Sequence, residues 1–443
     1  MPKLTRSHTV RHLIAWFRSN YWLVPSATIL ACVGLAYLMT ELDTVLPEKF
    51  IIKLGWVYTR DPAGARSILA VVSESMITVA GVVFSITVVA LTLASSQFGT
   101  RVLKSFARDS GNQFALGTLL GTFLYGVLVL RRVQSPPHPF VPSLSVAVSI
   151  FLAIASVVVL VFFIHHVIVE IQAESIVAEV ARDLYDTIDE VFPEDIGHGG
   201  HAPQPPPTPN FDRSQMRAVR SRKEGVIRSI DSGDLMRLAL QCDAIVEIVP
   251  LPGSFVTAQS VLARYLAPPE AHAKLDRKLP DCFDIGVHRT YEQDLRFAFD
   301  QLALITTRSL SPAINAVGTA EDAVRWLKAG LIRLGQRQIP SPYRYDDRNQ
   351  LRIITRTWDL SALLGEVFDP IRQSSQSLPA FVFHTIEALG DAARCVKNPA
   401  LRDALAEQIR RFADTANGFS QRCDRDNLRT AAAQLLQSIS ERK

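Results

Sequence analysis

The chain has 443 residues, of which 48% are apolar and 20% are charged, and its formal net charge is +4. The averages hide a split: residues 1–169 carry 13 basic and 6 acidic side chains, whereas residues 170–443 carry 34 basic and 37 acidic ones. This composition excludes a disordered chain, a disulfide-stapled secreted module and a strongly basic nucleic-acid binder. The sequence therefore predicts a membrane-like part joined to a soluble-like part.

Four windows in the first part contain no Asp, Glu, Lys or Arg: residues 19–40, 75–100, 110–130 and 133–169. Each contains a stretch of the roughly 20 apolar residues that a membrane-spanning helix needs. A soluble domain with four such stretches would have almost no polar surface. We therefore expect a four-helix transmembrane domain over residues 1–168, with spans at about 22–39, 76–93, 114–130 and 143–164.

The flanking charges suggest an orientation for these spans. Basic residues are almost equally divided between the two sides, but the first span usually dominates, and residues 1–18 before it hold four basic and no acidic side chains. The five cysteines are widely spaced and form no CxxC pair, as in a reducing compartment. We expect a multi-pass protein, in contact with membrane lipid, with its N-terminus and C-terminal part in the cytoplasm.

The second span carries hydroxyl side chains at steps of three and four residues, interleaved with Val82 and Val89, so that they share one helix face. These candidate pore-lining residues are Ser75, Thr78, Ser85, Thr92 and Ser96. The stripe is typical of a helix that lines a hydrated pathway. It is also compatible with hydroxyls that bond to their own helix or hold neighbouring helices together.

The third span contains Gly117 and Gly121, a small-xxx-small pair that lets two helix backbones approach closely. The spacing favours packing within one subunit and leaves a subunit interface open. His165 and His166, at the end of the fourth span, are interpreted as interfacial histidines, because adjacent helical residues point about 100° apart and do not share a metal.

The soluble part begins with an amphipathic pattern over residues 169–192, which predicts that the fourth span continues as a stalk helix. Six prolines over 193–210 then predict a linker. Residues 211–290 are typical of a small α/β module, with strands at 225–230, 244–249, 254–256 and 283–287 and a helix at 232–242. Short connections there predict a mixed or antiparallel sheet.

Residues 291–443 have a mainly helical pattern. We expect helices at about 295–310 and 320–334, with Thr319 as a cap, and a strand at 351–355. Further helices are expected at about 359–373, 379–394, 400–415 and 425–441. The predicted fold class is therefore a four-helix transmembrane protein with a cytoplasmic α+β domain that ends in a helical bundle.

Several motifs in the first part resemble a bacterial membrane-protein family known as domain of unknown function 2254. They are Gly64-Ala-Arg-Ser, the run from Ser75 to Thr87, Leu93-Ala-Ser-Ser-Gln-Phe-Gly-Thr-Arg101, Arg108-Asp-Ser-Gly-Asn-Gln113, Leu116-Gly-Thr and Phe163-Ile-His-His-Val. The second part adds Pro252-Gly-Ser-Phe-Val, Arg289-Thr-Tyr-Glu-Gln-Asp294 and Leu310-Ser-Pro-Ala-Ile-Asn315. The resemblance covers about residues 60–370. It implies a four-span protein of the bacterial inner membrane with a cytoplasmic domain, and implies no reaction.

The polar residues of these motifs are candidate site residues: Arg101, Asp109, Asn112, Gln113, Arg289, Glu292, Asp294, Arg308 and Asn315. In the family an aspartate usually follows the last motif, and Ala316 stands there in this chain. The group from Arg289 to Asn315 has two interpretations: a ligand site or gate, or structural ion pairs and helix caps. The position of Asn315 after Pro312 suits a left-handed or capping conformation.

No signature of a nucleotide, zinc-protease or serine-hydrolase site occurs in the chain. The sequence therefore predicts no enzyme, cofactor or metal, and no nucleic-acid partner. The preferred hypothesis is a homo-oligomeric ion channel or transport-related protein with a cytoplasmic gating or assembly domain. The alternative is a membrane-anchored sensor or scaffold whose cytoplasmic domain binds a ligand or a protein.

Overall fold

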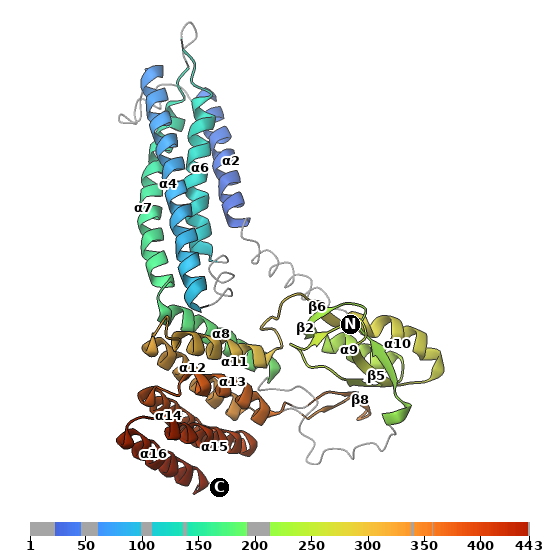
Figure 1. Cartoon of the computed structure of the whole chain (residues 1–443). Coiled ribbons are helices and arrows are strands. Elements are labelled where there is room, and N and C mark those ends of the chain that lie inside the picture. The colour runs from blue at the N-terminus through green and yellow to red at the C-terminus, as the bar shows by residue number, and fades with distance from the viewer. Residues whose placement is uncertain are drawn as a thin grey trace. The chain divides into compact units, whose positions relative to one another are not determined.

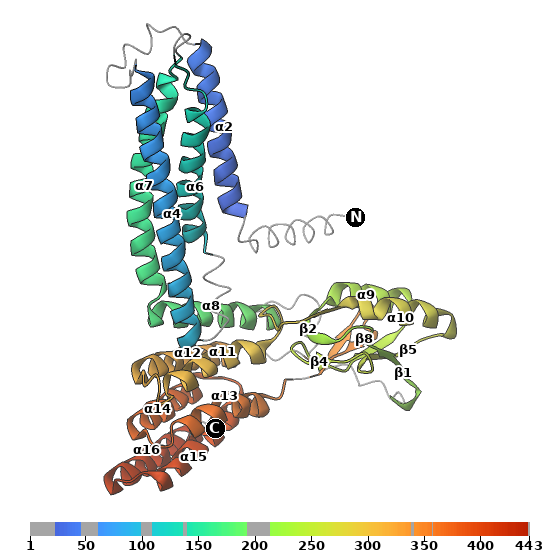
Figure 2. The ribbon, with the colours of Figure 1, turned by 45° about the horizontal axis from the view of Figure 1, so that its top comes forward.

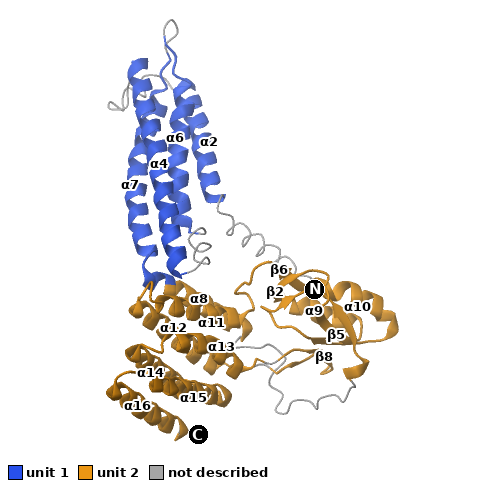
Figure 3. Cartoon of the chain, in the orientation of Figure 1, with its two compact units in different colours: residues 1–176 blue, residues 177–443 orange. Residues whose placement is uncertain are grey.

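The computed structural model describes residues 23–45, 61–98, 109–135, 140–192, 213–337, 341–356 and 358–441. Within these ranges the chain forms two compact units, residues 1–176 and residues 177–443 (Figure 3). The predicted linker at 193–210 and the candidate Arg101 lie outside the described residues.

Unit 1 is a bundle of four helices: α2 (Leu23–Val45), α4 (Pro62–Phe98), α6 (Ser110–Leu130) and α7 (Ser143–Glu170). They run side by side in two views of the molecule (Figures 1 and 2). Each is long and apolar enough to cross a membrane. The prediction of four apolar helices is confirmed.

Carboxylates at the helix starts explain where three of these helices begin. Asp61 accepts hydrogen bonds from the backbone N–H groups of Ala63 and Gly64, each at 3.0 Å, and Pro62 stands at the first helical position. The cap satisfies two of the free N–H groups of the first turn, and the proline has no N–H group that needs a partner. Helix α4 therefore extends well beyond the predicted span of 76–93, because hydropathy marks the apolar stretch and the cap marks the helix.

The fourth span and the stalk are separate helices, which corrects the prediction of a continuous one. Helix α7 ends at Glu170, Ile171 and Gln172 form a turn, and α8 covers Ala173–Val191. The amphipathic character of α8 is as predicted. Its apolar side is buried along Val177, Ala181, Leu184 and Ile188, because these positions share one helix face.

The α/β part of unit 2 contains two sheets. The five-stranded sheet has the order β1 (Arg217–Arg220), β5 (Val261–Leu266), β3 (Ile245–Ile248), β8 (Leu351–Ile354), β7 (Tyr343–Tyr345), and the β3–β8 pair is its one parallel pairing. The three-stranded sheet is antiparallel, with the order β4 (Phe255–Val256), β2 (Gly225–Ile230), β6 (Phe283–Gly286).

Both sheets contribute to one apolar core. Val219, Ile227, Val246 and Ile353 belong to the same buried cluster, together with residues of helices α9 (Ser232–Gln241) and α10 (His272–Lys278). Strands β7 and β8 lie beyond the predicted boundary at 290/291 and still join this sheet. The boundary was wrong, because the chain returns to pair Val246 with Ile353.

The rest of unit 2 is helical: α11 (Leu295–Ser309), α12 (Val317–Gln336), α13 (Leu360–Ser374), α14 (Pro379–Cys395), α15 (Pro399–Asp414) and α16 (Arg422–Ser440). Neighbouring helices pack closely, since a Cβ on Gly390 of α14 would lie 2.6 Å from the Cδ2 of Leu435 of α16. The predicted cap Thr319 was wrong: α12 begins two residues earlier, after Ala316.

Candidate functional site

The hydroxyl stripe of α4 lies on the outer surface of the bundle. Ser75, Thr78, Ser85, Thr92 and Ser96 are all exposed, and Val82 and Val89 between them are 53% and 56% exposed. The opposite side of the same helix is buried against α6 and α7, through Met76, Ala80, Val83 and Ala90. The stripe therefore has no packing role inside the bundle.

The structure shows what some of these hydroxyls contact. Thr78 and Thr92 donate to the carbonyl four residues earlier, at 2.7 and 2.8 Å, and Ser96 donates to the carbonyl of Leu93 at 2.8 Å. Bonds of this kind satisfy a hydroxyl in an apolar medium without a partner from another helix. The stripe is thus compatible with lipid as well as with a neighbouring subunit.

The two glycines of α6 pack within the subunit. A Cβ on Gly117 would lie 2.9 Å from the Cα of Pro25, and one on Gly121 would lie 2.7 Å from the sulfur of Cys32. Both neighbours are on α2, so the glycines let α2 and α6 approach closely.

A polar group occupies the end of the bundle where α6 begins. Asp109 caps α6 by accepting from the N–H groups of Gly111 and Asn112, and its Oδ2 lies 2.8 Å from Nε2 of His166 on α7. Asn112 and Gln113 are 5% and 3% exposed. Of the four candidates here, Asp109, Asn112 and Gln113 come together as one group, and His166 is a partner that the sequence did not reveal.

In unit 2, the structure brings Arg289 and Asp294 together. The guanidinium donates to both oxygens of the Asp294 carboxylate, at 2.7 and 3.0 Å, and lies 4.8 Å from the centre of the Phe297 ring. Asp294 is 1% exposed and also caps α11 by accepting from the N–H of Phe297. The arrangement holds the start of α11 in place.

Two motifs that are far apart in the sequence meet at this carboxylate. Gly253 has a φ of +88°, and a Cβ there would lie 2.1 Å from Oδ2 of Asp294. Gln293 bonds through its side chain to both the N–H and the carbonyl of Ile230 in β2, at 2.9 and 3.3 Å. The Pro-Gly turn, strand β2 and helix α11 are therefore joined through these motif residues.

The other candidates of the group lie apart from the Arg289–Asp294 pair. Glu292 is exposed, and among the described residues no ion pair of Arg308 is found. Asn315 adopts a φ of +50° in the turn between α11 and α12.

A further carboxylate, Asp300, was not expected from the sequence and accepts a hydrogen bond from Arg289 at 3.2 Å. Burial raises the pKa of Asp300 although Arg289 is adjacent. No local pattern indicated this contact, because residues six apart on a helix do not share a face.

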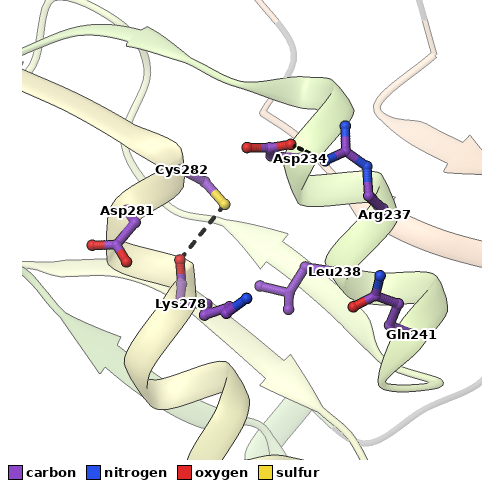
Figure 4. Close-up of a pocket in the computed structure, with 7 residues that line it drawn as sticks. All are labelled: Asp234, Arg237, Leu238, Gln241, Lys278, Asp281 and Cys282. Atoms are coloured by element: carbon purple, nitrogen blue, oxygen red, sulfur yellow. Dashed lines mark hydrogen bonds and ion pairs between the residues drawn. The ribbon is translucent and has the colours of Figure 1, made fainter. Parts of the chain in front are cut away.

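A pocket of about 310 Å³ lies between α9 and the segment that leads into β6 (Figure 4). Its lining consists of Asp234, Arg237, Leu238, Gln241, Lys278, Asp281 and Cys282. Burial raises the pKa of the Cys282 thiol to about 11, so the thiol is protonated at neutral pH and is not an activated nucleophile. Two of the charged residues that line the pocket, Asp234 and Arg237, form an ion pair with each other at 2.6 Å.

In the part of the chain that the structure describes, no three His, Cys, Asp or Glu residues are grouped as a metal site would require.

No solved structure matches the chain. The chain is 29% identical over 434 residues to an uncharacterized protein of Mycobacterium bovis, and equally to an uncharacterized protein of Mycobacterium tuberculosis. Each alignment covers 96% of this chain and 82% of the relative.

A family model described as a predicted membrane protein family matches residues 18–391, most of the chain. The match includes all four apolar helices and both groups of motif residues in the described structure. The chain belongs to the DUF2254 family of predicted membrane proteins.

Proposed function

We propose that the protein is a homo-oligomeric channel or transport-related protein of the bacterial inner membrane, in which the hydroxyl face of α4 meets neighbouring subunits. The observation that carries the proposal is that all five hydroxyl residues are exposed while the opposite face of α4 is buried. Four spans rarely enclose a pathway by themselves, so the pathway would form between subunits.

The spacing of the stripe supports contact with another helix. Positions 75, 78, 82, 85, 89, 92 and 96 alternate steps of three and four, the pattern of the seam between two left-handed supercoiled helices. Small residues at such a seam let helices approach closely within a bilayer. The exposed face of α4 therefore has the spacing of a helix–helix contact.

The test is ion flux through liposomes that contain the full-length protein. We expect Ser85→Leu combined with Thr92→Leu to reduce flux strongly, because it replaces two hydroxyls of the stripe with bulky apolar groups. The matched control is Val158→Leu with Val161→Leu, which adds bulk at two positions of α7 that are each 64% exposed. Equal flux for the two double variants, or no flux from the wild type, would refute the channel.

Oligomerisation is tested separately by cross-linking. In a chain without native cysteines, Ser85→Cys should form a disulfide between subunits upon mild oxidation, whereas Val158→Cys should not. A Ser85→Cys chain that stays monomeric in membranes would refute contact through the stripe.

In this proposal, unit 2 lies in the cytoplasm and gates or assembles the channel, and no catalysis is assigned to it. The second candidate is a membrane-anchored sensor or scaffold, which the pocket beside α9 favours because Lys278 lines it and would supply the positive charge for an anion, Arg237 there being paired with Asp234. Inorganic phosphate and nucleotides added to the full-length protein test it. A rise in melting temperature that Lys278→Ala abolishes would favour the sensor.

A further inference from the structure

Inside unit 1, on the side of the helices away from the exposed stripe, hydroxyl groups gather in one half of the bundle. We call this group the buried hydroxyl cluster. Its members come from α4, α6 and α7 and are all at most 5% exposed: Ser73, Thr122, Tyr125, Ser145, Ser149 and Ser156.

One helical turn of α6 brings these groups together. The hydroxyl of Thr122 lies 3.0 Å from that of Ser156, and Tyr125 donates to the carbonyl of Ser145 at 3.0 Å. A Cβ on Gly126 would lie 2.3 Å from the hydroxyl of Ser73, so that hydroxyl points at the same turn. Ser149 shares a face of α7 with Ser145 and Ser156, at spacings of four and seven.

Two of these hydroxyls have no hydrogen-bond partner in the structure. They belong to Ser73 and Ser149, which are 5% and 0% exposed and stand on different helices. Elsewhere in the bundle, Thr78, Thr87 and Thr118 bond to the carbonyl four residues earlier. An unsatisfied hydroxyl in an apolar interior is costly, and buried water usually supplies the missing bonds.

The cluster has a polar entrance at one end. The hydroxyl of Ser145 donates to Oδ2 of Asp43 at 2.6 Å, and the same carboxylate accepts from the N–H groups of Leu144 and Ser145 at 2.9 Å. Asp43 is half-exposed, at the end of the bundle where α7 begins. At the other end of the cluster, an apolar layer of Ala115, Leu119 and Phe163 is at most 1% exposed.

We propose that water enters unit 1 from the Asp43 end and binds the hydroxyls of Ser73 and Ser149. These two positions then form a hydrated site that the apolar layer closes, in a half of the bundle that also holds the buried Leu69, Val129 and Val146. The ligand is water, or a proton carried by it. The site lies within a single subunit and does not depend on the α4 stripe or on a channel between subunits.

Cysteine accessibility in membrane vesicles tests the proposal. In a full-length chain whose five native cysteines are replaced by serine or alanine, three single cysteines are compared: Ser149→Cys in the cluster, Ala115→Cys in the apolar layer and Val158→Cys on the outer surface of α7. Ser149 and Ala115 are both 0% exposed, so they form a matched pair. The probe is 2-(trimethylammonium)ethyl methanethiosulfonate, a permanently charged reagent that stays on the side of the membrane where it is added. A thiolate in water attacks its sulfenyl sulfur, a mixed disulfide forms, and methanesulfinate leaves.

We expect Ser149→Cys to react at least about tenfold faster than the other two, because only a hydrated thiol ionises readily. The reagent should reach it from one side of the membrane only, the side of Asp43. A rate as slow as that of Ala115→Cys would overturn the proposal. Equal fast rates at both buried positions would also overturn it, because they would indicate general opening of the bundle.

A second measurement does not depend on the cysteine variants. Ser149→Ala and Ser73→Ala should each lower the melting temperature of the full-length protein in detergent, because bound water loses a partner. If the hydroxyls are dry, their removal relieves a buried unsatisfied group and the melting temperature rises, which would overturn the proposal.

Discussion

The two units place their carboxylates differently. In unit 1, Asp61 and Asp109 each cap the helix that follows them, and Asp43, in the last turn of α2, accepts from backbone N–H groups at the start of α7. In unit 2, carboxylates are joined to arginines in partly buried ion pairs, such as Asp294 with Arg289 and Asp346 with Arg352. Carboxylates thus bond mainly to backbone N–H groups in the apolar bundle, whereas buried carboxylates in unit 2 also hold guanidinium groups.

The difference follows from the surrounding medium. A charge in an apolar medium is costly, and the capping carboxylates of unit 1 are stabilised by the backbone N–H groups and the dipoles of the helices that they cap. A soluble core tolerates a charge when a bidentate partner and a backbone donor accompany it. Ion pairs with arginine therefore connect distant segments in unit 2, whereas in unit 1 glycine packing, hydroxyls and capping carboxylates connect them.

The largest effect is expected for Asp294→Ala. It removes the bidentate bond to Arg289 and the α11 cap at once, and should lower the free energy of unfolding by about 3 kcal/mol. Denaturant unfolding of the full-length protein measures it. The control is Asp426→Ala, whose ion pair with Arg422 is exposed and should contribute almost nothing. Similar losses for both variants would remove the contrast between buried and surface pairs.

Gly253→Ala tests whether the turn must meet this carboxylate. A Cβ would stand in the Asp294 carboxylate, and the φ of +88° disfavours any side chain. We expect a loss of about 2 kcal/mol. Gly318→Ala in α12 is the control, because nothing lies within 4 Å of its Cβ, and it should be neutral or stabilising. A neutral Gly253→Ala would show that the contact is dispensable.

In unit 1, Asp43→Asn should cost less, about 1 kcal/mol, since an amide still accepts one backbone bond and only the charge is lost. Thermal unfolding in detergent measures the change. A loss as large as that of Asp294→Ala would mean that the charge of a capping carboxylate in the bundle contributes as much as a buried ion pair in unit 2.

Asp300→Asn should have the smallest effect, within about 0.5 kcal/mol of the wild type at pH 7 and in the stabilising direction. Burial raises the pKa of this carboxyl above its ordinary value of 3.8, so the folded state holds the proton more tightly. The protonated Asp300 carboxyl therefore stabilises the folded state below its ordinary pKa of 3.8, and this stabilisation is lost as the pH rises through the raised pKa. Melting temperatures of variant and wild type should therefore converge as the pH falls from 7 to 4. Divergence would contradict the raised pKa.

Local patterns predicted much of the architecture. Strand β2, helix α9 and the helices from α13 to α16 were expected close to their observed bounds, because hydrophobic periodicity and caps act over a few residues. The four apolar helices were also expected, although α4 begins well before its predicted span. The Arg289–Asp294 pair was also a candidate from the sequence, because the two residues lie only five positions apart in one motif. Helix α10 and strands β1, β5 and β7 were missed, since their short segments carry weak periodic signals.

The sequence by itself determined that α4 carries a regular hydroxyl stripe and that four helices are apolar enough to span a membrane, since both depend on residue spacing along a single helix. Only the tertiary structure decided that the stripe lies outside the bundle, that Asp43 caps a helix that begins 100 residues later, and that β8 pairs with β3. These arrangements depend on contacts between segments that are distant in the sequence. The entropy lost when such segments come together, and the packing between them, leave no trace in a local sequence pattern.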